Sequence, residues 1–281
     1  MSWGLPAVFV VLWSTGFIGA KLGLPYAEPI VFLELRFLFV LAILLPLCWL
    51  SQAPWPTSRR FVQMAVSGAL LQAGYLGGVF ASLHHGMPAG VSALVTGMQP
   101  VLTAALGGWL LREKVTPRQW LGLVLGFVGV LLVVGDRIVV EHLGATAVGL
   151  SVLALLSITL GTLWQKRHGA GVDLRTGAAI QFIAAAVVLA PFALLEGGSV
   201  RWSGQFVFAL AWLVVVLSLG AIFLLLTLIK RGRATQVSSL FYLVPPTTAL
   251  IAWPLFGETY SLAAAAGMGL AMLAVWLVMK A

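Results

Sequence analysis

The sequence has few charged side chains and a single cysteine, and each shortage excludes a class of protein. Only 9% of the 281 residues are charged, whereas soluble domains contain about 25%. These polar groups are too few to cover a water-soluble globule. The one cysteine, Cys48, lies inside an apolar run, so an intramolecular disulfide and a thiolate metal cluster are both excluded. We therefore expect no metal site and no cofactor.

Long apolar runs take the place of the missing polar residues. Hydrophobic residues make up 61% of the chain, and the mean hydropathy is +1.06. About 20 apolar residues cross the hydrocarbon core as a helix, and lipid-exposed backbone must be helical because nothing else satisfies its polar groups. The sequence predicts an all-α transmembrane protein with ten helices, at about 3–23, 30–50, 61–83, 88–111, 117–135, 144–166, 174–195, 203–229, 235–256 and 261–279.

The net charge of +8 is explained by membrane topology, so no nucleic-acid partner is expected. Positively charged residues accumulate in the cytoplasmic loops of membrane proteins. If the N-terminus is cytoplasmic, twelve Lys and Arg residues lie in cytoplasmic segments and only Lys21, Arg137 and Arg201 lie on the opposite side. We expect a multi-pass protein of the inner membrane with both termini in the cytoplasm. The first apolar run is expected to be a span and not a signal peptide, because no Lys or Arg precedes it.

The chain contains an internal repeat with a spacing of 145 or 146 residues. Gly16 matches Gly161 and Lys21 matches Lys166 at 145, and Pro100 matches Pro246 at 146. Five spans therefore repeat as five spans, in predicted domains 1–135 and 144–281. An odd number of spans inverts the second copy, and inverted repeats are typical of secondary transporters with a binding site near the membrane centre.

Several short motifs resemble the EamA repeat of the drug/metabolite transporter superfamily. They are Leu12-Trp13-Ser14-Thr15-Gly16-Phe17, Leu35-Arg36-Phe37, the Arg112-Glu113-Lys114 turn, Thr116-Pro117 and Trp120-Leu121-Gly122. The second copy keeps Gly257-Glu258 but has Tyr260-Ser261 in place of Thr-Pro. The resemblance implies two inverted five-helix repeats around a central cavity, and export of amino acids, metabolites or drugs. It also implies an arginine at the position of Arg36.

The fourth predicted span carries a polar face. Ser92, Thr96, Gln99 and Thr103 recur at spacings of 4, 3 and 4, so they lie on one side of a helix. Pro100 lacks an N–H and leaves the Thr96 carbonyl without its helical partner. This face is expected either to bind substrate in a cavity or to form hydrogen bonds between helices.

Further candidates come from the third and ninth spans. Gln72 and Tyr75 share a face of the third span, where they would bind substrate or pack against another helix. Tyr242 stands in the second copy where Thr96 stands in the first, either lining the cavity or packing with its hydroxyl bonded internally. Pro246, like Pro100, is a candidate point of flexure during gating.

Two charged and two aromatic residues complete the candidate set. Ionisable groups inside a membrane are functional candidates by default, so Glu34 is considered for proton coupling. Arg36 is considered for anion binding or gating, and alternatively for a structural hydrogen bond. Trp13 and Trp164 lie far enough inside their spans to close a cavity, with interfacial anchoring as the alternative.

We therefore expect a secondary transporter that exports small amphipathic metabolites, amino acids or drugs by alternating access. Its partners would be a small-molecule substrate, the lipid bilayer and, as a candidate coupling ion, the proton; a monomer and a homodimer are both compatible with the sequence. A flippase for a lipid-linked substrate is the first alternative. A membrane-embedded lipid-modifying enzyme is disfavoured, because no nucleophile–base motif or catalytic residue is recognisable.

Overall fold

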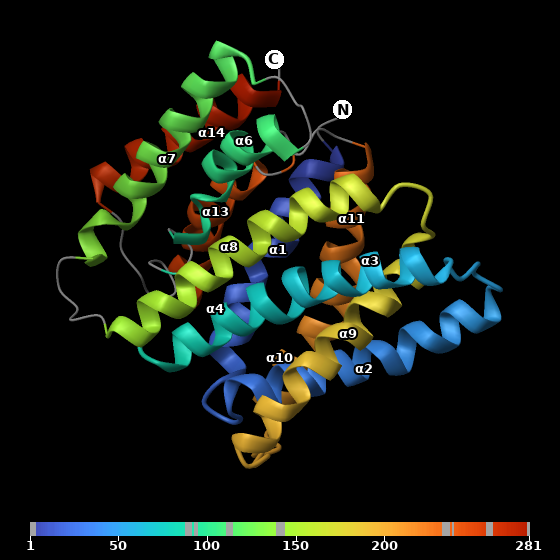
Figure 1. Ribbon diagram of the computed structural model, residues 1–281. Helices are drawn as coiled ribbons and strands as arrows, with labels where there is room; N and C mark the ends of the chain where they lie inside the picture. The colour runs from blue at the N-terminus through green and yellow to red at the C-terminus, as the bar shows by residue number, and fades with distance from the viewer. Residues whose placement is uncertain are drawn as a thin grey trace.

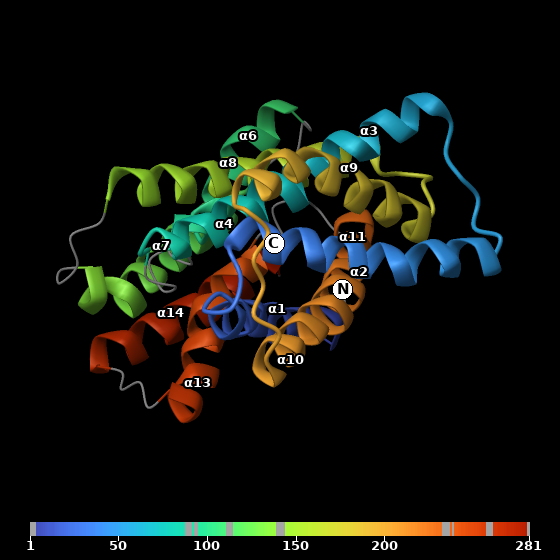
Figure 2. The ribbon, with the colours of Figure 1, turned by 90° about the horizontal axis from the view of Figure 1, so that it is seen from below.

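The computed structural model describes residues 4–87, 92, 95–110, 115–138, 144–231, 237, 239–256 and 261–279. The residues described are helical apart from connecting turns and one isolated β-bridge between Ala27 and Val200. The motif residues 112–114 and 257–260 lie outside this set, as does Ser238. Figures 1 and 2 show the helices in two views at right angles.

The described helices, in chain order, are α1 (Gly4–Gly23), α2 (Pro29–Leu50), α3 (Ser58–Gly68), the π-helix η1 (Ala69–Gly74), α4 (Tyr75–His84), α6 (Gln99–Leu110), α7 (Pro117–Ile138), α8 (Ala145–His168), α9 (Leu174–Leu195), α10 (Gly204–Trp212), the π-helix η2 (Leu213–Ala221), α11 (Ile222–Arg231), the 3₁₀-helix η3 (Leu240–Leu243), α13 (Val244–Phe256) and α14 (Leu262–Met279).

The helices have the length and composition of membrane spans. Within the described residues, six helical runs of 20 to 28 residues are apolar enough to cross a bilayer, and a shorter apolar helix covers Ala265–Val278. Large apolar side chains such as Leu38, Ile43 and Trp49 are exposed on the outside of the structure. A surface of this kind is stable in lipid, so the predicted all-α transmembrane fold is confirmed.

A glycine face joins α7 to α14, which lie side by side in both ribbon views (Figures 1 and 2). A Cβ atom at Gly122 would lie 2.9 Å from the carbonyl oxygen of Ala274, and one at Gly129 would lie 2.7 Å from that of Gly267. Glycine is therefore required for the two backbones to approach this closely. The small residues of these spans serve packing within one chain.

Two spans contain π-helical segments at matching positions of the repeat. Gly74 ends η1 and Gly220 lies in η2, and the two glycines are 146 residues apart. A π-helix widens the turn and is frequently found at functional sites. Hydrophobic periodicity does not report this change in backbone hydrogen bonding, so the π-segments could not be predicted.

Each central proline, expected inside one continuous apolar span, lies instead near the start of a helix. A turn at Gly97–Met98 precedes α6, and Pro100 is the second residue of that helix. Pro246 is the third residue of α13, which follows the 3₁₀-helix η3. Proline suits the first turn of a helix because its missing N–H would have no partner there. Both prolines therefore mark helix starts within the predicted spans.

Candidate functional site

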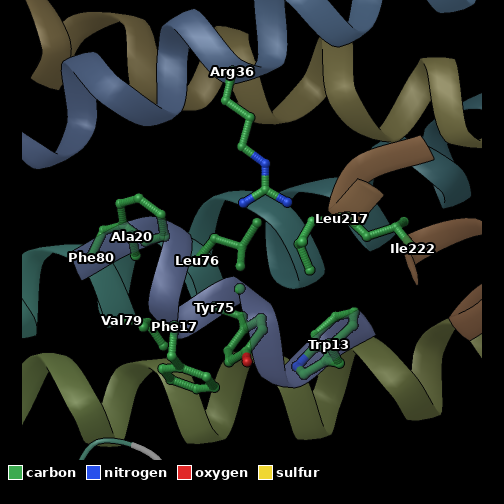
Figure 3. A pocket seen from close by; sticks show the side chains of 11 residues that line it. Trp13, Phe17, Ala20, Arg36, Tyr75, Leu76, Val79, Phe80, Leu217 and Ile222 are labelled. Carbon is green, nitrogen blue, oxygen red and sulfur yellow. The ribbon is translucent and has the colours of Figure 1, made fainter. Parts of the chain in front are cut away.

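A cavity lies between α1, α2, α4, η2 and α11, in the interior of the helical structure. It encloses about 430 Å³ of space between atoms, its open side included. We call it the Arg36 cavity, because Arg36 is the one charged residue among those that line it (Figure 3). The lining residues are Trp13, Gly16, Phe17, Ala20, Arg36, Tyr75, Leu76, Val79, Phe80, Leu217 and Ile222.

Helical periodicity explains two walls of the Arg36 cavity. Trp13, Gly16, Phe17 and Ala20 recur at three- and four-residue spacing along α1, so they share one face. The residues from α4 follow the same rule. Gly16 lets η2 approach α1, because a Cβ atom there would lie 3.2 Å from a methyl carbon of Leu217. The cavity is thus bounded by spans of both predicted repeats.

Arg36 places a positive charge in the buried interior of a predicted membrane span. Its side chain is only 3% exposed, and its Nε donates a 2.8 Å hydrogen bond to the Ser218 hydroxyl in η2. The terminal nitrogens of the guanidinium point into the cavity (Figure 3). Among the described residues, no carboxylate forms an ion pair with it. Inserting such a charge costs about 2.5–3.5 kcal/mol at a helix centre, which indicates a role beyond packing.

Aromatic rings form the wall opposite the guanidinium. Trp13 and Tyr75 stack with ring centroids 6.2 Å apart and an interplanar angle of 11°. The edge of Phe241 packs against Trp13 at 5.4 Å, and Phe9 packs against both. Aromatic contacts of this geometry hold large rings in fixed positions. The cavity therefore combines one cation with a rigid apolar wall.

A smaller cavity lies among α3, α8, α9 and α11. The space between atoms here amounts to about 170 Å³, its open side included, and we call it the Gln181 cavity. Gln165 and Gln181 line it, and the Gln165 side-chain oxygen accepts hydrogen bonds from Gln181 Nε2 at 3.0 Å and from Ser67 at 2.6 Å. Asp173 and Lys230 contribute charges of opposite sign at its edge.

The polar face of the fourth span is buried, and its residues are not among those lining the Arg36 cavity. Gln99 Nε2 donates to the Thr162 hydroxyl of α8 at 3.1 Å, and the Thr96 hydroxyl donates to the Ser92 carbonyl at 2.9 Å. Within the described structure, the side-chain oxygens of Gln99 and Ser92 have no hydrogen-bond partner. The Gln99–Thr162 bond joins the two repeats in this conformation, whereas the Thr96–Ser92 bond lies within the fourth span.

The remaining candidates occupy other places. Tyr242 is fully buried; its hydroxyl donates to the Leu123 carbonyl at 2.9 Å and its ring covers Gly126. The indole N–H of Trp164 donates to the Gln63 carbonyl at 2.8 Å.

Two further candidates carry buried oxygens without a partner. Gln72 lies buried in η1, and in the described structure its Oε1 has no hydrogen-bond partner. The Oε2 atom of Glu34 is also buried and likewise has no hydrogen-bond partner in the described structure. Neither residue is among those that line the Arg36 cavity. Of the predicted residues, the structure brings Trp13, Arg36 and Tyr75 together.

At one end of the molecule, the α1–α2 and α9–α10 loops are held together by several contacts. The Arg201 backbone N–H donates to the Tyr26 carbonyl at 2.9 Å, and the Arg201 guanidinium lies 5.5 Å from the centre of the Tyr26 ring. Glu196, beyond the end of α9, accepts from the N–H groups of Ile30 and Val31 at 2.9 Å each. Burial raises the pKa of Glu196, although these two donors act in the opposite direction.

Hydrogen bonds also tie the loops at the other end. Thr176 donates to the Pro54 carbonyl at 2.9 Å, and Lys166 donates to the Ile229 carbonyl at 3.1 Å. Asp173 caps α9 by accepting from the backbone N–H of Arg175 at 2.9 Å. The hydrogen bond from the Arg175 side chain lowers the pKa of Asp173. Both ends of the described structure are therefore held by contacts between loops and helix ends.

Comparison with known proteins decides the family. The model of the EamA-like transporter family matches residues 2–135 and 145–280. The chain belongs to the EamA-like transporter family. The resemblance seen in the motifs is thereby confirmed, and the protein is a multi-pass membrane transporter. Residues from both matched segments line the Arg36 cavity.

Individual relatives agree along nearly the whole chain. The uncharacterized transporter YvbV of Bacillus subtilis is 26% identical, with 98% of this chain and 90% of the relative covered. A probable amino-acid metabolite efflux pump of Salmonella typhimurium is 25% identical, with 97% and 93% covered. The uncharacterized inner membrane transporter YedA of Escherichia coli is 26% identical, with 95% and 87% covered.

A solved crystal structure has the same fold. It superimposes with a TM-score of 0.79, covering 98% of this chain and 95% of its own, at 20% sequence identity. The family and the names of the relatives point to a transporter rather than an enzyme.

Proposed function

We propose that this EamA-family protein is a secondary transporter that exports small amphipathic solutes across the inner membrane by alternating access. The observation that carries the proposal is the Arg36 cavity, a partly open space inside the membrane region that is bounded by both matched segments. Its mixture of aromatic rings, one cation and one phenol suits a solute with an apolar body and a polar group. The name of the Salmonella relative, an efflux pump, supports the outward direction.

The pairing of the two cavities supports alternating access between inverted halves, 1–135 and 144–281. Three residues that line the Arg36 cavity have repeat partners in the Gln181 cavity: Ala20 with Gln165, Arg36 with Gln181, and Phe80 with Leu226. The spacings are 145, 145 and 146 residues. If the halves exchange conformations, the smaller cavity opens as the larger one closes. The helix starts at Pro100 and Pro246 supply the points at which the halves would flex.

A reversible cross-link tests this cycle. Ala27 and Val200 form an antiparallel bridge between the two halves, and paired residues of this kind lie at a Cα separation that a disulfide can span. Because Cys48 is the only native cysteine, Ala27→Cys/Val200→Cys would be made in a Cys48→Ala background. The protein in proteoliposomes would be assayed for solute exchange with a panel of amphipathic metabolites.

We expect oxidation to stop exchange and a reductant to restore it, with Ala27→Cys/Cys48→Ala as the control that oxidation does not affect. Exchange that continues at full rate through a formed disulfide would contradict alternating access at this end. The same assay with and without a pH gradient tests Glu34. If Glu34 carries the coupled proton, Glu34→Gln abolishes the stimulation by the gradient and retains exchange.

A further inference from the structure

We infer that the Arg36 cavity recognises a monoanion, and that the transported solute carries a carboxylate on a flat apolar body. This inference rests on the proposed transport function and specifies its substrate class. The first observation is the state of the guanidinium. Of its three nitrogens, Nε donates to Ser218, and the two terminal nitrogens face the cavity (Figure 3).

The terminal nitrogens have the geometry that a carboxylate requires. Two parallel N–H groups of a guanidinium match the two oxygens of a carboxylate in a bidentate pair. The hydrogen bond to Ser218 at 2.8 Å fixes the orientation of this fork. A lysine would offer a point charge on a flexible stem in its place. The arginine is thus pre-organised for a planar anionic group arriving from the cavity.

The charge of the lining sets the charge of the ligand. Arg36 is the one ionic side chain among the residues that line this cavity, and its other polar groups are the Tyr75 hydroxyl and the Trp13 indole N–H. A dianionic phosphate would carry a second negative charge into an apolar enclosure without a second cation to neutralise it. A neutral solute would leave the guanidinium uncompensated. A monoanion neutralises the guanidinium without bringing in a second, unpaired negative charge.

The other walls describe the body of the solute. Trp13 and Tyr75 are stacked and nearly parallel, and Phe17, Val79 and Phe80 complete an apolar lining. A small amphipathic molecule would place its carboxylate at Arg36 and its flat apolar part against these rings. The Gln181 cavity has Gln181 at the position equivalent to Arg36, so it lacks this fork. The cation that lines it, Lys230, donates to the Val172 carbonyl and shares the lining with Asp173. We therefore assign carboxylate recognition to the Arg36 cavity.

Equilibrium binding to the full chain in lipid nanodiscs tests the inference with matched probes at pH 7.5. The acids are benzoate, phenylacetate and indole-3-acetate, and the neutral controls of the same shape are benzamide, phenylacetamide and indole-3-acetamide. Phenyl phosphate supplies the dianion. We expect at least one acid to bind at least tenfold tighter than its amide and tighter than phenyl phosphate.

Two substitutions locate the preference. Arg36→Gln should reduce acid binding to the level of the amide, and Arg36→Lys should retain part of the tenfold preference. Arg118→Gln, which removes an exposed arginine on α7 far along the chain from the site, should bind the acid like the native protein. The acid-to-amide ratio of the native protein needs no variant, so the test stands even if Arg36→Gln does not fold.

The inference is overturned if no acid binds, if each acid and its amide bind equally, if phenyl phosphate binds tightest, or if the preference survives in Arg36→Gln. Its failure is distinguishable from failure of the transport proposal. If neutral solutes are exchanged and the engineered disulfide between positions 27 and 200 blocks that exchange, alternating access is supported and only the monoanion inference fails. If the disulfide has no effect on exchange but the preference for acids is intact, alternating access fails and the monoanion inference stands.

Discussion

The Arg36 cavity and the Gln181 cavity have equivalent frames and different chemistry. Arg36 on α2 donates to Ser218 in η2, and the repeat equivalents of these two residues are Gln181 on α9 and Gln72 in η1. The helix α9 packs on η1 as α2 packs on η2. In the Arg36 cavity, the residue at this position is a charged arginine that faces open space. In the Gln181 cavity, it is a neutral amide whose Nε2 donates a hydrogen bond to Gln165.

The aromatic wall follows the same division. Trp13 and Tyr75 line the Arg36 cavity, whereas the residues at 145 and 146 positions further on are Ile158 and Ala221. A repeated backbone is needed for a two-sided cycle, but a solute without two-fold symmetry needs different groups on its two sides. In the proposed cycle, the repeat would supply the motion, and single-residue differences between the copies would supply the recognition.

The largest effect is expected when the second side is made to resemble the first. Gln181→Arg would place another guanidinium at a fully buried position. Lys230, a second cation, lines the same cavity. An uncompensated buried charge costs about 3–5 kcal/mol. We expect little folded protein, measured as monodisperse yield in size-exclusion chromatography. Gln181→Leu is the control of similar volume. Normal yield and thermal stability of Gln181→Arg would show that the second cavity tolerates a charge as the first does.

An intermediate effect is expected from Ser218→Ala. This change removes the acceptor that orients the Arg36 guanidinium, and hydrogen bonds to charged groups contribute about 1.5–3 kcal/mol. We expect affinity for the best-bound carboxylate to fall about tenfold or more, measured by calorimetry in nanodiscs. The matched control is Ser151→Ala, which removes a buried hydroxyl outside both cavities that has no partner in the described structure. Equal effects of the two substitutions would mean that Ser218 does not position Arg36.

The fold, the family and the cavity could be predicted from the sequence to different extents. Apolar run length and the 145-residue repeat were enough for the transmembrane fold and the family. Trp13, Arg36 and Tyr75 are candidates from the sequence because charged and aromatic residues inside a span are costly or unusual, and the structure places all three in the lining of one cavity. Their grouping, and Ser218 as the partner of Arg36, depend on how the halves pack, which local periodicity does not contain.

The polar face of the fourth span illustrates the limit. Ser92, Thr96 and Gln99 are all buried, with a turn at Gly97–Met98 between Thr96 and Gln99. A helical wheel cannot tell a cavity from a neighbouring helix. The structure places Gln99 against Thr162 of the other half. Tyr242 was equally undecided, and its hydroxyl is satisfied by the Leu123 carbonyl. Their role in another conformation of the transporter stays a prediction.

A smaller effect should distinguish the two ends of the molecule by pH. The pKa of Asp173 is lowered by Arg175, so its contribution to stability is present above the unfolded-state pKa and is lost as pH falls through the folded-state value. Asp173→Ala should cost about 0.5–2 kcal/mol at neutral pH, the range for a helix N-cap. Thermal unfolding between pH 3 and pH 7 should show the difference from native protein shrinking at low pH.

The smallest effect is expected from Glu196, at the end of the molecule opposite Asp173. Its contribution to stability should depend on pH in the opposite direction to that of Asp173. Because the pKa of Glu196 is raised by burial, the folded state binds its proton more tightly than the unfolded state does. Stability from this group is therefore greatest at low pH and falls as pH rises through the folded-state value. Glu196→Gln should change thermal stability little at neutral pH and flatten its decline above the unfolded-state pKa. A large loss at neutral pH would show that the ionised carboxylate is needed to cap α2.

The most direct test of the account is the initial rate of solute exchange in proteoliposomes, compared for Arg36→Gln and Gln181→Leu. The two substitutions remove equivalent side chains from the two halves, and both proteins would be matched for folded amount. Losing a buried, hydrogen-bonded charge partner costs about 2–5 kcal/mol. We therefore predict a rate at least about 30-fold below native for Arg36→Gln and a rate within about threefold of native for Gln181→Leu. Equal losses, or a greater loss for Gln181→Leu, would contradict the assignment of recognition to the Arg36 cavity.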